Sequence, residues 1–261
     1  MTIDLQGLRS DIPQLVVDNL TIEQGQIYVV LGPNGAGKTT LMKALLGLLP
    51  SATAQTHLVN GSPFAKLSLK DRSRYFGYCP QSLVRHPDLN SERFLASAAA
   101  NHSIPPALRL KEARSLLHDS GKGHLAKRAL TTLSGGEWQH LILLSLTLKD
   151  APYWFLDEPT NHLDPCNQIE TFEYLTKAAF EQKRGILITS HDLSLLGLLH
   201  QPSMPPPIML LLRNGVLQDT IPMDSPDLSQ LLSGLLQVPI SVTSDAMGRT
   251  FLHPGRETPN D

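Results

Sequence analysis

Short apolar runs recur along the chain, and longer stretches with helical spacing separate several of them. Three of the runs are apolar at nearly every position, which is typical of strands buried on both faces of a sheet. These runs are residues 27–31, 153–156 and 185–189. Helical patterns follow the first two, over residues 40–46 and 165–181. This alternation predicts an α/β fold with a parallel sheet and right-handed crossovers.

Strand patterns also fill the N-terminal part of the chain. A polar pair, Asp18-Asn19, separates the first two predicted strands, and the third ends in the turn signal Asn60-Gly61. A fourth strand is closed by Pro80-Gln81. The four predicted strands are residues 15–17, 20–22, 56–61 and 75–79.

The pattern changes to helix between about residues 88 and 150. Residues 90–100 and 105–118 have helical spacing, and Pro105-Pro106 suits the first turn of the second helix. Because this block lies between predicted strands of the sheet, we predict that it is an inserted α-helical subdomain.

The C-terminal part begins after three consecutive prolines, residues 205–207. Its pattern predicts a buried strand, a turn and a second strand, then a helix and a closing hairpin. The clearest of these segments are residues 208–212, 226–236, 238–242 and 250–252. Residues 254–261 are expected to be a disordered tail.

Composition narrows the class of protein without identifying it. The 261 residues are 41% hydrophobic and 18% charged, which is ordinary for a globular protein and excludes wholesale disorder. The net charge of −2 provides no basic field for nucleic acid. Two cysteines form no disulfide framework. No secretion signal or apolar run of membrane-spanning length is evident, so a soluble protein of the cytosol is expected.

The stretch with the clearest chemistry is residues 32–39, G-P-N-G-A-G-K-T, which follows an apolar run and precedes a helical pattern. That context is the one a phosphate-binding loop requires, because its backbone N–H groups converge on an anion at a helix N-terminus. Lys38 is expected to reach the β- and γ-phosphates of a nucleoside triphosphate, and the Thr39 hydroxyl is expected to bind Mg²⁺. The alternative is a glycine-rich turn before a helix. The predicted phosphate-binding residues are Gly32, Pro33, Asn34, Gly35, Ala36, Gly37, Lys38, Thr39 and Thr40.

Acidic residues follow the second buried run. Asp157 at the carboxyl end of this predicted strand can hold Mg²⁺, directly or through water, because ligands collect at such strand ends. Glu158 follows at the position expected for an attacking water. Without Asp157 beside it, Glu158 is simply a solvated acid, and Asp157 itself can be a helix or turn cap.

Three other segments are less specific when each is taken alone. Gln81 is then a turn residue, and His191 is a bystander beside a Ser or Asp helix cap. Residues 133–137, L-S-G-G-E, open a helix with small residues and form an anion site with nothing anionic nearby in the sequence.

In this order, the phosphate loop and the segments around Gln81, L-S-G-G-E, Asp157-Glu158, Asp164 and His191 resemble the nucleotide-binding domain of ATP-binding cassette (ABC) transporters. The resemblance covers the chain from about residue 15 to residue 242. It implies a P-loop NTPase (RecA-like) parallel-sheet core, with an N-terminal antiparallel β subdomain and an inserted α-helical subdomain. The implied boundaries are residues 1–84 and 150–253 for the core, 85–149 for the insertion and 254–261 for the tail.

The resemblance also implies a role for each motif. Glu158 is the general base that polarises water, Gln81 contacts Mg²⁺ or that water, and His191 donates to the γ-phosphate. Residues 133–137, called the signature below, contact the γ-phosphate held by a second copy. The implied signature residues are Ser134, Gly135, Gly136 and Glu137. The working form is then a head-to-tail homodimer with two ATP molecules at the interface, where Asp164 couples the sites.

The sequence departs from the family pattern in three places. The aromatic residue that usually stacks on adenine falls near Arg9, whose guanidinium can itself stack on a base, so Arg9 is the candidate adenine contact. After the signature, Trp138, His140 and Ser145 stand where basic residues are more usual. The three prolines at residues 205–207 form an insertion of unassigned role.

Within the family, L-S-G-G-E-W-Q and the short C-terminal segment most resemble ATPase subunits of vitamin B12, iron-siderophore and haem importers. The implied protein lies on the cytoplasmic side of the inner membrane as a peripheral subunit. Its implied partners are integral membrane permease subunits and a periplasmic binding protein, not nucleic acid. Permease contact is expected around residues 82–90. A single-domain exporter ATPase is the first alternative, and a soluble ribosome-associated ABC ATPase is the second.

Overall fold

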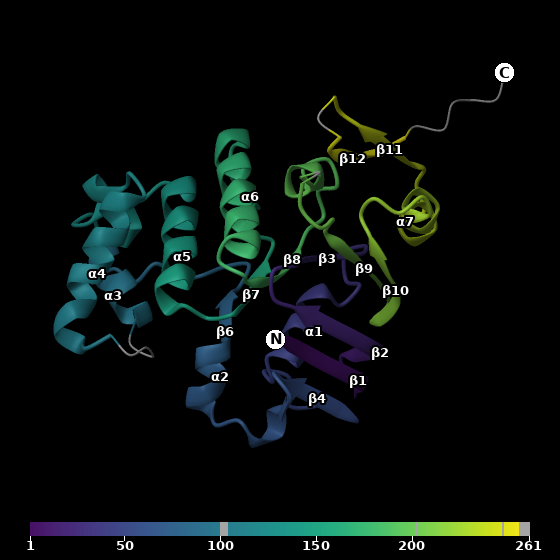
Figure 1. Ribbon diagram of the computed structural model, residues 1–261, viewed down its shortest axis with the longest axis horizontal. Coiled ribbons are helices and arrows are strands. Elements are labelled where there is room, and N and C mark those ends of the chain that lie inside the picture. The colour runs from purple at the N-terminus through teal and green to yellow at the C-terminus, as the bar shows by residue number, and fades with distance from the viewer. Residues whose placement is uncertain (100–103, 202, 247, 256–261) are drawn as a thin grey trace. The chain divides into compact units, whose positions relative to one another are not determined.

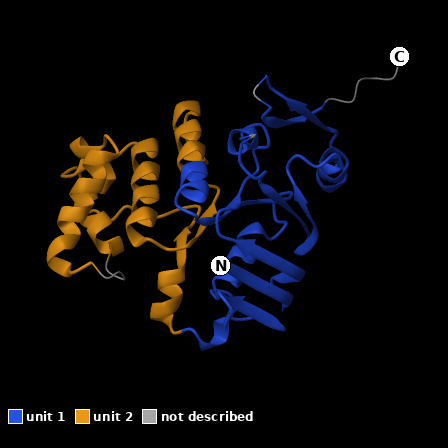
Figure 2. Ribbon diagram, viewed as in Figure 1, with its two compact units in different colours: residues 1–67, 175–261 blue, residues 68–174 orange. Residues whose placement is uncertain are grey.

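The computed structural model describes residues 1–99, 104–201, 203–246 and 248–255. The chain divides into two compact units (Figure 2). Unit 1 comprises residues 1–67 and 175–261, and unit 2 comprises residues 68–174. Part of the predicted tail, residues 256–261, lies outside the described residues, whereas Pro254 ends a strand.

Unit 1 is built on a sheet that runs in the order β5-β4-β1-β2-β10-β9-β3-β8 (Figure 1). The buried strand β3 pairs in parallel with both β8 and β9, as expected from its uninterrupted apolar sequence. The N-terminal strands β1 and β2 instead form an antiparallel pair with alternating burial. The strands are β1 (Thr2–Asp11), β2 (Gln14–Glu23), β3 (Ile27–Leu31), β4 (Thr56–Val59), β5 (Ser62–Pro63), β8 (Gly185–Thr189), β9 (Ile208–Arg213) and β10 (Val216–Pro222).

Unit 1 has two further features. Helix α1 (Lys38–Leu45) starts within the last two residues of the phosphate loop, at Lys38. Helix α7 (Leu228–Leu236) contacts β9 and the two-stranded hairpin of β11 (Ile240–Ser244) and β12 (Thr250–Pro254). The C-terminal helix and hairpin predicted from the sequence are therefore present, with bounds shifted by one or two residues.

Unit 2 contains a parallel strand pair and a group of packed helices. Strand β7, whose residues are all buried, pairs with β6, and the Phe76 ring lies 5.7 Å from that of Phe155. Helices α3, α4 and α5 pack on one another, which confirms that the middle of the chain is helical. The elements are α2 (Leu69–Tyr75), β6 (Phe76–Cys79), α3 (Ser91–Ala98), α4 (Pro106–Asp119), α5 (Gly135–Lys149) and β7 (Tyr153–Asp157). Helix α6 (Pro165–Phe180) begins in this unit.

One local prediction was wrong, and one strand boundary differs by a residue. Residues 15–17 and 20–22 belong to one continuous strand, because β2 stays paired with β1 across Asp18 and Asn19, whose side chains are exposed. The strand predicted at residues 75–79 is present as β6, but it begins at Phe76, because Tyr75 ends helix α2. That helix is capped by Ser68, whose hydroxyl accepts from the N–H of Asp71, and it buries no residue, so it has no apolar periodicity to predict it.

Candidate functional site

The phosphate loop lies between a buried strand and a helix, as predicted. Gly35 and Gly37 have φ of 78° and 100°, a region that L side chains rarely adopt, so glycine is needed at both turns. Gly32 is needed for a different reason, because a Cβ there would lie 2.1 Å from the carbonyl oxygen of Leu212. The loop conformation therefore depends on its glycines and on strand β9 behind it.

Lys38 is folded across this loop. Its Nζ donates to the carbonyl oxygens of Gly32 at 2.9 Å and Pro33 at 3.3 Å, and the residue is 8% exposed. The ammonium is thus held above the loop by backbone oxygens, which phosphate oxygens can replace as acceptors.

The β9–β10 hairpin supports the loop from within unit 1. Its turn is Asn214-Gly215, with φ of 48° and 75°. Gly215 donates its N–H to Ala36 of the phosphate loop at 2.8 Å and accepts from the N–H of Val16 in β2 at 2.7 Å. A Cβ on Gly215 would lie 2.1 Å from the Gln14 carbonyl oxygen. Sequence reasoning assigned no role to this glycine, although Asn-Gly between apolar runs is a strong hairpin signal.

In unit 2, Gln81 and Glu158 meet although they are far apart in the sequence. Gln81 Nε2 donates to Glu158 Oε2 at 2.8 Å, and Asn161 Nδ2 donates to the same oxygen at 3.1 Å. Glu158, the first residue after β7, has φ of 51°, which is an uncommon value for a non-glycine residue. Because the Gln81 amide donates through nitrogen, its carbonyl oxygen remains the group suited to a cation.

Asp157 ends β7 and is 3% exposed. Its charge affects two neighbours on β6. Burial raises the pKa of the Cys79 thiol to about 12, and Asp157 adds to the shift. Burial likewise raises the pKa of Tyr78, again with a contribution from Asp157. Both groups therefore stay protonated near neutral pH and add no negative charge at this strand end.

The signature is held by reciprocal hydrogen bonds at the start of α5. Ser134 Oγ accepts from the N–H of Glu137 at 3.2 Å, and Glu137 Oε2 accepts from the N–H of Ser134 at 2.7 Å. Arg128 forms an ion pair of 2.7 Å with Glu137. The Ser134 N–H is the largest cause that lowers the pKa of Glu137. Glu137 is thus engaged within its own chain, whereas Ser134 and Gly135 are exposed.

Asn167 links the signature to Asp164. Its N–H and Nδ2 donate to the two oxygens of Asp164, at 3.0 and 2.5 Å. The backbone N–H of Asn167 is also the largest cause that lowers the Asp164 pKa. A Cβ on Gly136 would lie 2.2 Å from the Asn167 side chain. No pattern in the sequence indicated this contact between the start of α6 and the signature.

His191 and Arg9 lie in unit 1. His191 is exposed and follows β8, in a turn where Ser190 Oγ accepts from the N–H of Asp192 at 3.1 Å. The helical segment after it is only a 3₁₀ turn, Leu196–Leu199. Arg9 lies on β1 and pairs with Asp18 at 2.5 Å. Its use as an adenine contact remains a prediction.

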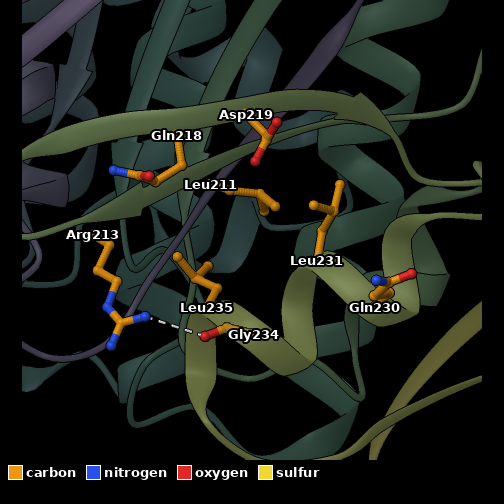
Figure 3. A pocket seen from close by; sticks show the side chains of 8 residues that line it. All are labelled: Leu211, Arg213, Gln218, Asp219, Gln230, Leu231, Gly234 and Leu235. Atoms are coloured by element: carbon orange, nitrogen blue, oxygen red, sulfur yellow. Dashed lines mark hydrogen bonds between the residues drawn. The ribbon is translucent and has the colours of Figure 1, made fainter.

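A cavity in unit 1 involves none of these residues. It has a volume of about 280 Å³ and lies between β9, β10 and α7 (Figure 3). Arg213 donates to the Gly234 carbonyl oxygen at 3.2 Å at its rim. Among the residues that the structure describes, no group of three or more His, Cys, Asp or Glu could hold a metal ion.

The strand, glycine-rich loop and helix, with the lysine folded over the loop, define a P-loop nucleoside triphosphatase. The chain matches the family described as ABC transporter over residues 16–161. The chain therefore belongs to the ABC transporter family, binds ATP and is an ATPase. The predicted family, fold class and enzymatic class are confirmed.

Two relatives share about a third of their aligned residues with this chain. It is 38% identical over 197 residues to a zinc import ATP-binding protein of Paramagnetospirillum magneticum, across 73% of this chain and 68% of that protein. It is 35% identical over 187 residues to a protein of the same name from Pseudomonas fluorescens, across 70% of this chain and 64% of that protein. The match thus leaves about a third of each relative uncovered.

Solved structures show the same fold at lower identity. A chain of a metal-chelate type ABC transporter in an inward-facing conformation has a TM-score of 0.78 and 22% identity, with 98% of both chains covered. A dimeric ATP-binding cassette bound to ADP and phosphate has a TM-score of 0.70 and 18% identity, across 86% of this chain and 100% of that one. In the part of the chain that the structure describes, no helix is long and apolar enough to cross a bilayer.

Proposed function

We propose that this chain is the ATP-hydrolysing subunit of a metal importer and that it drives a separate membrane permease. The observation that carries the proposal is the 38% identity to a zinc import ATP-binding protein across 73% of the chain. The whole-length fold similarity to a metal-chelate type transporter supports the same assignment. The ATPase lies peripherally, on the cytoplasmic side of the inner membrane, and the complete importer includes a periplasmic binding protein.

The proposed hydrolysis uses residues from both units. The phosphate loop and Lys38 bind the triphosphate, and His191 donates to the γ-phosphate. Glu158 accepts a proton from the attacking water as general base. Its oxygen Oε2 accepts from both Gln81 and Asn161, so these two amides orient the carboxylate.

Mg²⁺ fits the donors at hand. The Thr39 hydroxyl, the Gln81 amide oxygen and the buried Asp157 carboxylate are oxygen ligands of the kind that Mg²⁺ prefers. We propose that these three groups hold the ion with ATP. Bound there, Mg²⁺ supplies charge neutralisation at the phosphates.

We further propose that two copies act as a head-to-tail dimer. Ser134 and Gly135 are exposed at the N-terminus of α5, where backbone N–H groups suit an anion. The Ser134 side chain is exposed, and its hydroxyl is a group that can donate to a γ-phosphate on the second copy. Asp164 then couples the two sites. The proposed domain boundaries remain residues 1–84 and 150–253 for the core and 85–149 for the insertion.

The permease contact is proposed for residues 82–90, at the start of the helical insertion. Val84 is 87% exposed and Leu83 is 38% exposed, and such apolar side chains on a loop suit a protein partner. Val84 is therefore the position at which to test the contact. A charge placed there should weaken complex formation.

The cargo is the least determined part of the proposal. Sequence patterns favour cobalamin, an iron-siderophore or haem, whereas the matched relatives are named for zinc import. We propose a metal cargo and take zinc as the first to test, because identity over most of the chain outweighs a seven-residue motif.

The test is purification of tagged Glu158→Gln protein from native membranes with Mg-ATP, followed by identification of the proteins that copurify. A polytopic permease should be recovered, and Val84→Asp in the same background should reduce its yield. Uptake of ⁶⁵Zn should then fall in cells that carry only Glu158→Gln protein, compared with the unchanged chain. Uptake of labelled cobalamin, siderophore and haem is measured in parallel.

Other outcomes would revise the assignment. An export complex among the copurifying proteins would make this chain an exporter ATPase. Ribosomes without any membrane protein would contradict the transporter role and leave the ATPase assignment intact. Unchanged zinc uptake with reduced uptake of a chelate would restore the substrate expected from the sequence.

A further inference from the structure

One arginine in the proposed permease-contact region does not face solvent like its neighbours. Residues 81–88 connect β6 to the helical insertion, and all of them are exposed except Arg85, which is half-buried. Its side chain therefore has a partner within unit 2, although its position in the sequence suggests a surface charge.

The partners of Arg85 belong to the signature. Arg85 Nη1 donates to the carbonyl oxygen of Leu133 at 2.5 Å, and Nη2 lies 3.5 Å from that of Ser134. The guanidinium carbon lies 5.6 Å from the centre of the Trp138 ring, and that ring lies 5.1 Å from the Phe94 ring. Trp138 is 7% exposed, so the guanidinium rests on a fixed aromatic surface.

These bonds fix one peptide group from both sides. The peptide between Leu133 and Ser134 has its C=O on Arg85 and its N–H on Glu137 Oε2, at 2.5 and 2.7 Å. Glu137 is in turn held by Arg128. A peptide group restrained at both ends cannot rotate freely. The direction of the Ser134 side chain, and of the N–H groups that follow it, depends on this peptide.

We propose that Arg85 is a positioning residue that presets the signature for the γ-phosphate of the ATP on a second copy. The inference rests on the proposed dimer. Arg85 also joins the exposed segment at Leu83 and Val84 to the signature, so a partner that displaces this segment changes the orientation of Ser134. Arg85 itself contacts no ATP in this account, and Leu83 and Val84 are the residues of this segment proposed to contact the permease.

The first test follows the amide of Ser134 in the nucleotide-free chain. Arg85→Gln should speed hydrogen exchange about tenfold at Ser134 and Gly135, because a charge-assisted bond that restrains this peptide is lost. Exchange along the rest of α5 should stay unchanged. Arg93→Gln removes the same charge from an exposed position on α3 and is the matched control. Arg85→Lys, which keeps one charged donor, should give an intermediate rate.

The second test measures ATP-dependent dimerisation in the Glu158→Gln background by sedimentation equilibrium. Arg85→Gln should weaken the dimer about tenfold relative to Arg93→Gln. The affinity of the monomer for a fluorescent ATP analogue and the midpoint of thermal unfolding should stay the same, because Arg85 acts on the signature, which in the proposed dimer serves the second copy.

Each outcome bears on a different claim. Exchange and dimerisation that match those of Arg93→Gln would overturn the positioning role. A joint loss of thermal stability and exchange protection throughout α5 would also overturn it, because Arg85 would then be a packing residue. If the Glu158→Gln parent fails to dimerise with ATP, the proposed dimer fails, and the exchange experiment still decides the role of Arg85 within its own chain.

Discussion

At the scale of single residues, the hydrogen bonds of each functional atom indicate what ATP must displace. Lys38 is bound to carbonyl oxygens of its own loop, so phosphate oxygens replace existing acceptors and the ammonium need not be newly desolvated. Glu158 carries two amide donors on one oxygen. Its carboxylate is oriented before any substrate arrives, which favours the proposed role as general base.

Substitution of the proposed base should separate hydrolysis from binding. Glu158→Gln keeps the size of the side chain and removes its basicity, so steady-state ATP hydrolysis should fall by about 10²- to 10⁴-fold. The affinity for ATP should change little. Glu173→Gln alters an exposed acid on α6 and is the control, with activity expected near that of the unchanged chain. Comparable hydrolysis by the two variants would remove Glu158 from this role.

Gly215, in the β9–β10 turn, should tolerate no side chain. In Gly215→Ala, a φ of 75° is combined with a Cβ placed 2.1 Å from a backbone oxygen, so the free energy of unfolding should fall by about 2 kcal/mol or more. Gly61→Ala has a φ of 78° with nothing within 4 Å, and it should cost only about 1 kcal/mol. Urea unfolding of both variants measures the difference, which equal losses would contradict.

At the scale of elements, helix α5 shows how one helix start serves both stability and function. The reciprocal bonds between Ser134 and Glu137 satisfy N–H groups that the helix itself cannot. They also leave Ser134 and Gly135 exposed. Arg85 and Arg128 reach this start from two separate segments, so its geometry is a property of the packed helical unit and not of the helix alone.

The cap on α5 should make stability depend on pH in a defined direction. The folded state lowers the pKa of Glu137 from its ordinary value of 4.5, so the ionised carboxylate stabilises the fold above that value. The contribution is lost as the pH falls through the folded-state pKa. The loss of unfolding free energy in Glu137→Gln should therefore be larger at about pH 7 than at about pH 3.5.

Urea unfolding at the two pH values checks this prediction, with Glu173→Gln as an exposed-acid control. The control should show no such difference between the two pH values. A destabilisation by Glu137→Gln that is the same at both values would mean that the charge of Glu137 is not what holds the helix start.

At the scale of the whole molecule, the proposed catalytic groups are divided between two compact units. The phosphate loop and His191 belong to unit 1, whereas Gln81, Glu158 and the signature belong to unit 2 (Figure 2). In the proposed dimer each ATP site also draws on two chains, because it combines the phosphate loop of one copy with the signature of the other.

Mixing two inactive variants should reveal that arrangement. Lys38→Ala removes the phosphate contact, and Ser134→Arg blocks the signature, so each variant alone should be nearly inactive. A heterodimer of the two contains one site in which both motifs are intact. An equimolar mixture should therefore regain up to about a quarter of the original ATPase activity. Activity that stays at the level of the separate variants would contradict a signature that acts in trans.

The sequence alone was sufficient for the family, the ATPase class and most of the fold. Residues 32–39 and the buried strands β3, β7 and β8 have local signatures, because a glycine-rich loop and an apolar run reflect the conformation of the segment itself. The sequence alone could not predict α2, which is held by its cap and buries no residue. It also could not predict that β2 is continuous, because that depends on pairing with β1.

Only the tertiary structure revealed the residues that hold these motifs in place. Gly215 supports the phosphate loop, Asn167 lies against Gly136, Arg85 binds the carbonyl before Ser134, and Gln81 meets Glu158. The partners in the first, third and fourth of these contacts are more than 40 positions apart in the sequence. The physical reason is that a motif records what its own backbone must do, whereas a contact between distant segments depends on how the intervening chain packs.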